Sequence, residues 1–80
     1  MRAGSSQPLD AFARTVRKAR RDLELSQEAL ADRAGLSSKH VGEIERANKD
    51  PRLTTVLKLA RALDVRSGEL FTAVDERLDP

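Results

Sequence analysis

The sequence predicts an all-α protein, a compact five-helix bundle that contains a helix-turn-helix. Apolar residues recur three and four positions apart along most of the chain, as they do on one face of a helix. Two Leu-Ser pairs stand where helices would begin, with Gly35 between them. No run alternates apolar and polar residues as a half-buried strand does. A chain of 80 residues can bury one core, so a single domain is expected.

The first helix is expected over about 8–23. Residues 1–7 are polar and patternless, which predicts a flexible N-terminal arm in front of one domain over 8–80. Pro8 suits a first helical turn, where a missing N–H costs nothing. The apolar stripe of this helix consists of Leu9, Phe12, Val16, Ala19 and Leu23.

The second and third helices begin with the same signal. Ser26 is an N-cap for a helix over about 27–34, and Gly35 closes that helix in the left-handed conformation. Ser37 repeats the N-cap for a third helix that starts at Ser38. Two short helices joined by a glycine-containing turn are typical of a helix-turn-helix.

Two further helices complete the predicted bundle. Asn48, Asp50 and Pro51 indicate a loop, after which apolar spacing predicts a fourth helix over about 53–63. A fifth helix is expected from Ser67 to Val74 or beyond.

The third helix should present a polar face to the outside. With Val41 and Ile44 turned inward, Lys39, Glu43 and Arg46 point outward, and Gly42 lies among them. A glycine there costs helix stability and leaves room for another molecule to approach. The groove of DNA and an ordinary solvated surface are both compatible with this face.

Composition and charge narrow the functional classes. The chain has no cysteine and one histidine, so no metal site and no cofactor are expected, and His40 has no partner for catalysis. No apolar run approaches the roughly 20 residues of a membrane span, and the start lacks a signal peptide, so we expect a soluble, cytoplasmic protein. Because no carboxylate is placed to orient His40 and so small an all-α chain implies no cleft, we do not expect an enzyme. Residues 14–58 carry 11 Lys and Arg against 7 Asp and Glu, whereas residues 64–80 carry 2 against 5. A polyanion partner for the middle of the chain fits this asymmetry, as does a mixed solvated surface.

Several runs of the sequence strongly resemble the Cro and lambda-repressor type of helix-turn-helix protein, also called the XRE family. The resemblance spans about residues 9–71, and its order and spacing are specific. The matching runs are 25–31 (LSQEALA), 34–37 (AGLS), 41–46 (VGEIER), 50–53 (DPRL), 57–65 (LKLARALDV) and 69–71 (ELF). The resemblance implies a transcriptional regulator that represses, or represses and activates, by binding a partly palindromic double-stranded operator as a dimer. It places the third helix in the major groove and implies no small-molecule substrate.

The resemblance also implies roles for individual residues. The family reads bases at the positions of Ser38, Lys39 and Glu43, and Lys39 has the chemistry for guanine while Glu43 has that for cytosine. Arginine and glutamate at the positions of Arg20 and Glu45 form a structural ion pair inside the family's domain. Contacts with backbone phosphate are implied for Gln27, Arg46, Asn48, Lys49 and Arg52.

The sequence departs from the family at two helix ends, where Glu24 and Ala47 replace the usual glycines. Each should cost roughly 1 kcal/mol or shift the turn by one residue, and Asn48 is a natural substitute for Ala47. Ala29 replaces an acidic residue, which removes the capping box of the second helix.

The fifth helix and the tail are expected to pair two copies of the chain. One recognition helix reads too few bases for a unique site, and a homodimer supplies two half-sites. We expect the core to bury Leu70, and a partner to share Phe71, Val74 and Leu78. The alternative function is a protein-interaction module of the same fold, such as an antitoxin or regulatory partner, with weak or no DNA binding. Glu43 on the outward face is the best argument for it.

Overall fold

The computed structural model describes residues 7–78, and these residues form five helices and no strand. The helices are α1 (Gln7–Asp22), α2 (Gln27–Ala34), α3 (Ser38–Glu45), α4 (Leu53–Ala62) and α5 (Ser67–Leu78). The predicted all-α fold is therefore confirmed. Helix α1 starts one residue earlier than predicted, so Gln7 belongs to it, and the rest of the predicted arm lies outside the described residues. None of these helices is long and apolar enough to cross a membrane.

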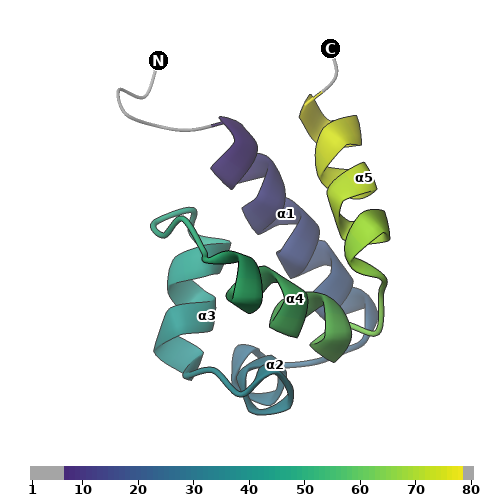
Figure 1. The fold of residues 1–80 in the computed structure, drawn as a ribbon. Helices are drawn as coiled ribbons and strands as arrows, with labels where there is room; N and C mark the ends of the chain where they lie inside the picture. The colour runs from purple at the N-terminus through teal and green to yellow at the C-terminus, as the bar shows by residue number, and fades with distance from the viewer. Residues whose placement is uncertain (1–6, 79–80) are drawn as a thin grey trace.

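The helices pack in a bundle in which the helix-turn-helix forms one end. Helix α5 runs alongside α1, and the start of α1 and the end of α5 lie at the same end of the molecule (Figure 1). Helices α2 and α3 pack on each other at the opposite end, and α4 crosses in front of α1 (Figure 1). Helix α3 also packs against α1. Helix α3 is therefore supported by both α1 and α2.

One apolar core joins all five helices. Its most deeply buried large side chains come from four helices and from the end of α4: Val16, Leu30, Val41, Ile44, Leu59 and Leu63. Leu70 and Val74 add the inner face of α5. Burial of apolar area supplies most of the driving force for such a bundle, since the described part of the chain contains little other tertiary bonding.

The ends of the first four helices share one construction. Each ends with a residue in the left-handed region, and the N–H group that follows this residue donates to a carbonyl five positions back. The left-handed residues are Glu24, Gly35, Ala47 and Asp64, with φ between 58° and 69°. Helices α2 and α3 then begin on Ser26 and Ser37, whose hydroxyl oxygens accept hydrogen bonds from the N–H groups of Ala29 and His40. Both predicted N-caps and the predicted Gly35 terminus are confirmed.

Candidate nucleic-acid interface

A buried polar cluster supports α3 from behind. The Arg20 side chain of α1 donates from Nε to Glu45 Oε2 at 2.7 Å and from Nη2 to Glu45 Oε1 at 3.0 Å. Glu45 is only 3% exposed, and these hydrogen bonds raise the pKa of Arg20 above its ordinary value. Arg20 also donates from Nη1 to the Leu25 carbonyl at 2.8 Å. One guanidinium thus ties α1 to α3 and to the turn before α2, and the pair implied by the resemblance is in contact.

Gln27, the first residue of α2, belongs to the same cluster. Its Nε2 donates to Glu45 Oε1 at 3.0 Å. The carboxamide can donate only through Nε2, so part of its capacity is already used inside the domain. Sequence reasoning assigned this side chain to a phosphate and missed its bond to Glu45, for which the sequence offers no local signal.

The predicted base-reading residues lie along one side of α3. Ser38 and Lys39 are exposed in the first turn, and Glu43 is half-buried one turn later. Helix α3 buries Val41, Ile44 and Glu45 on its opposite side. Since Ser37 caps the helix, the first turn is held with its polar side chains outward.

Gly42 is not the open position that the helical pattern predicts. It is buried, and the three atoms nearest to the place of a Cβ are Arg46 Nη1 at 3.0 Å, Gln27 Oε1 at 3.7 Å and Arg46 Cζ at 3.8 Å. The Arg46 side chain therefore folds back along its own helix and covers the glycine. The expectation that another molecule approaches Gly42 directly is wrong, because side chains of the domain already occupy that space.

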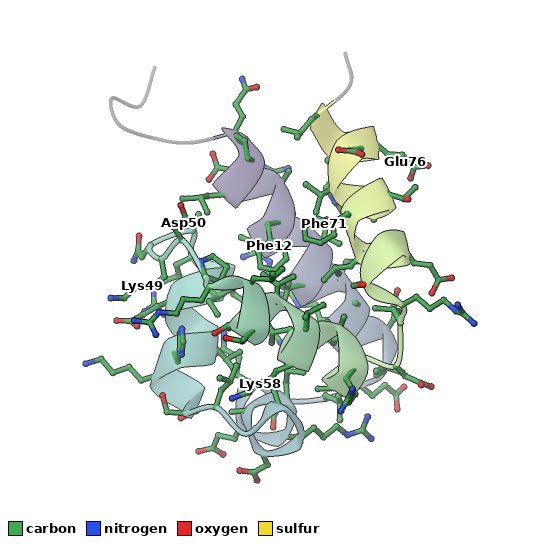
Figure 2. The ribbon with its side chains drawn as sticks, in the orientation of Figure 1. Phe12, Lys49, Asp50, Lys58, Phe71 and Glu76 are labelled. Atoms are coloured by element: carbon green, nitrogen blue, oxygen red, sulfur yellow. The ribbon has the colours of Figure 1, made fainter. Side chains whose placement is uncertain are left out.

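The loop after α3 extends the polar surface. Asn48, Lys49 and Arg52 are exposed there, and Figure 2 shows Lys49 and Asp50 at the outer edge of this loop. Ala47 itself adopts φ 59°, so Asn48 does not replace it in the left-handed position as expected. The Asn48 N–H instead donates to the Glu43 carbonyl at 2.9 Å, which fixes the turn without a shift.

Four cations on this surface have no acidic partner among residues 7–78. They are Lys39, Arg46, Lys49 and Arg52, and the ion pairs in the described part of the chain involve other residues. His40 belongs to α3 and lines a hollow between this helix and the loop, together with Glu43, Lys49, Asp50 and Arg52. No three His, Asp or Glu side chains in residues 7–78 are grouped as metal ligands would be. The surface can therefore bind an anion through side chains that the fold does not use.

A second surface is apolar and lies on α4 and α5. Leu53, Leu57 and Phe71 are 67%, 45% and 44% exposed. In the view of Figure 2, Phe71 extends from α5 above α4. Leu53 and Leu57 belong to the apolar spacing that predicts this helix, but α4 turns Val56 and Leu59 inward and leaves both leucines outside.

The predicted partner-facing residues of α5 divide into two kinds. Val74 is 7% exposed and packs in the chain's own core, because α5 lies along α1, so it offers a partner little surface. Leu78 is half-buried against the same core. Of the three, Phe71 is the one that leaves a large apolar area open.

Known proteins share this sequence and this architecture. Residues 16–70 match the model of the helix-turn-helix family. The HTH-type transcriptional regulator y4dJ of Sinorhizobium fredii is 39% identical over 57 residues, which cover 71% of this chain and 74% of that protein. The control protein C.SmaI of Serratia marcescens is 38% identical over 61 residues, or 76% of this chain and 73% of that protein.

A solved structure agrees with both. The restriction-modification controller protein C.AhdI from Aeromonas hydrophila superposes with a TM-score of 0.77 at 43% identity, covering 79% of this chain and 96% of that one. Residues 16–70, which match the family model, include the capped pair α2–α3, the buried cluster of Arg20 and Glu45, and the loop cations. By sequence and by structure, the chain belongs to the helix-turn-helix family.

Proposed function

We propose that this protein is a transcriptional regulator that binds a partly palindromic operator in double-stranded DNA as a homodimer. The observation that carries the proposal is the set of unpaired cations around a capped, outward-facing α3, with Lys39 in its first turn and Arg46, Lys49 and Arg52 at its end and in the next loop. A helix of this width enters the major groove, and flanking cations meet phosphates. The relatives named as regulators and control proteins support the same role.

Within this role, the contacts divide by chemistry. Ser38, Lys39 and Glu43 are placed to meet base edges, where Lys39 donates to guanine and Glu43 accepts from cytosine. Arg46, Asn48, Lys49 and Arg52 are placed to meet phosphates on either side of the groove. Gln27 is left with one free amide hydrogen for a phosphate, because Glu45 takes the other.

Dimerisation supplies the second half-site. Leu53, Leu57 and Phe71 are the exposed large apolar side chains of α4 and α5, and we name this set the α4–α5 surface. A large exposed apolar patch is typical of an interface. Two copies related by a two-fold axis would then present two α3 helices to DNA about one helical turn apart.

Selection from random duplexes tests the function. The folded protein should enrich a motif with two related half-sites at moderate salt. Failure of a folded, dimeric protein to enrich any motif would refute the proposal and favour the alternative, a protein-interaction module with weak or no DNA binding.

Two substitutions test the division of contacts. Lys39→Ala should cost about 1–3 kcal/mol on the selected site and relax preference at one base position, because base contacts discriminate. Arg52→Ala should weaken cognate and scrambled duplexes alike and lower the slope of log K against log salt by about one. Fluorescence anisotropy over a salt series measures both. An equal effect of Lys39→Ala on both duplexes would show that Lys39 contacts phosphate.

Sedimentation at micromolar concentration tests the α4–α5 surface. Leu57→Asp should shift the chain to monomer, because it places a charge in the apolar contact. Leu23→Asp is the matched control, since Leu23 is a leucine of similar exposure, 40%, just after α1. Normal dimers of Leu57→Asp, or equal disruption by Leu23→Asp, would show that the copies pair elsewhere.

A further inference from the structure

Gly42 lies in the middle of α3, where a glycine is costly. Replacing a helical alanine by glycine destabilises a helix because the backbone loses more freedom on folding. Its φ is not in the left-handed region, and none of the three atoms nearest to its Cβ site belongs to a backbone. Neither turn geometry nor close packing of α2 against α3 therefore requires glycine at this position.

The side chain that uses the space is Arg46. Its Nη1 is 3.0 Å from the place where a Cβ would stand, and its Cζ is 3.8 Å away. Contacts of a real Cβ at 3.0 Å are very tight, so the guanidinium would have to move if residue 42 carried a methyl group. A methyl group at residue 42 would thus displace the charge of Arg46 from its place over the glycine.

Gln27 closes the other side of this space. Its Oε1 is 3.7 Å from the same point, and its Nε2 is held by Glu45 at 3.0 Å. Because Glu45 is in turn bound twice by Arg20, the carboxamide is fixed by the buried cluster. The Arg46 guanidinium therefore lies near the junction between the first residue of α2 and the outward side of α3.

We infer that Gly42 is a positioning residue for DNA binding: it provides a seat in which Arg46 lies flat on α3 beside Gln27, aimed at a phosphate at the edge of the groove. This inference rests on the proposed function. According to this inference, Gly42 determines the position of Arg46, a cation that has no acidic partner among residues 7–78. A preordered guanidinium loses less side-chain freedom on binding than a mobile one, and so binds more tightly.

The test is Gly42→Ala, with Gly68→Ala as the matched control. Both add one methyl group to a helix, but no atom lies within 4 Å of the Cβ site at Gly68. Gly42→Ala should keep or raise the thermal midpoint, because alanine favours the helix and the displaced atoms end a flexible side chain. It should nevertheless weaken binding to cognate and scrambled duplexes by about tenfold or more, the value of one hydrogen bond to a charged group, and lower the salt slope by about one. Gly68→Ala should bind as the wild type does.

A double-mutant cycle shows whether the effect passes through Arg46. Arg46→Ala alone should lose about as much affinity as Gly42→Ala, and Gly42→Ala in that background should lose no more. Wild-type affinity of Gly42→Ala would overturn the inference. So would an equal further loss in the Arg46→Ala background, since the new methyl group would then obstruct DNA directly.

A readout without DNA separates this inference from the proposed function. The Arg46 Nε–H resonance should report a restrained side chain in the wild type and in Gly68→Ala, and an averaged one in Gly42→Ala. Equal mobility of the Arg46 side chain in the wild type, Gly68→Ala and Gly42→Ala would overturn the inference even if every variant binds DNA. Loss of restraint at Arg46 in Gly42→Ala alone would support the inference even if the wild type bound no duplex. Failure of the wild type to bind any duplex would refute only the proposed function.

Discussion

Helix α2 is joined to its neighbours by two turns with the same backbone construction. The first turn consists of Glu24, Leu25 and Ser26, and the second consists of Gly35, Leu36 and Ser37. In each, a left-handed residue is followed by leucine and then by a serine N-cap. The leucine N–H donates to the carbonyl five residues back, at 3.1 Å in the first turn and 2.9 Å in the second.

The two turns differ in how they reach that conformation. Gly35 adopts φ 69° without steric cost, whereas Glu24 adopts φ 58° against the preference of every residue with a Cβ. The first turn is also held by a residue outside it, because Arg20 donates to the Leu25 carbonyl at 2.8 Å, whereas no side chain among residues 7–78 binds the Leu36 carbonyl. The same backbone conformation is thus stabilised by a glycine in the second turn and by a tertiary contact from Arg20 in the first.

The largest expected effect comes from removing that tertiary contact. Arg20→Ala should lower the free energy of unfolding by about 3 kcal/mol or more, because it leaves the buried Glu45 carboxylate with Gln27 as its one remaining side-chain partner. Urea denaturation measures the loss. Arg21→Ala is the control, since Arg21 is exposed and forms no ion pair among the described residues, and it should change stability by less than about 0.5 kcal/mol. A loss equally small for Arg20→Ala would mean that the first turn holds itself.

The serine caps should have smaller and nearly equal effects. Ser26→Ala and Ser37→Ala each remove one side-chain bond to a helix N–H, at 2.9 Å and 3.0 Å. Each should cost about 1 kcal/mol in chemical denaturation. A much larger loss at Ser26 would show that the cap and the Arg20 contact act together, and the comparison of the two turns would then have to treat them as one unit.

Exchanging the left-handed residues should change stability with opposite signs in the two turns, and Glu24→Gly should give the smallest change of all. Glu24→Gly relieves the steric cost and should stabilise the chain by about 0.5–1 kcal/mol, whereas Gly35→Ala should destabilise it by about 1 kcal/mol. Thermal denaturation followed by circular dichroism resolves both shifts. Destabilisation by Glu24→Gly would show that the Glu24 side chain contributes more than its backbone costs.

The helix limits and caps could be predicted because they depend on neighbours in the sequence. Ser26, Gly35 and Ser37 act on groups within four residues, and all three were assigned correctly. The left-handed residue after α3 was predicted wrongly. Asparagine adopts this conformation more easily than alanine, so Asn48 was expected there, but the Asn48 N–H donates to the Glu43 carbonyl and Ala47 takes the position. Interactions between residues close in the sequence were thus enough to predict the helix limits, except at Ala47, where a hydrogen bond of the turn decides which residue is left-handed.

The errors at the candidate site arose where side chains from other turns or helices meet. A helical projection places Gly42 outside, but it contains neither the returning Arg46 side chain nor Gln27 from α2. A helical projection likewise cannot show that Leu57 is half-exposed on α4 whereas Val74 is buried against α1 and the core. Only the packing angle of two helices decides such cases, and apolar spacing does not determine that angle. The roles assigned to Lys39 and Glu43 stay predictions.

The three residues other than glycine at the left-handed helix ends have a consequence for the lifetime of the molecule. Glu24, Ala47 and Asp64 are each held at positive φ by the rest of the fold, and together they store about 2 kcal/mol, with Asp64 the least costly. That energy corresponds to a roughly 30-fold larger population of unfolded chains than glycine at all three positions would leave. Proteases act on unfolded chains, so glycine at these three positions should lengthen the lifetime of the protein in a cell.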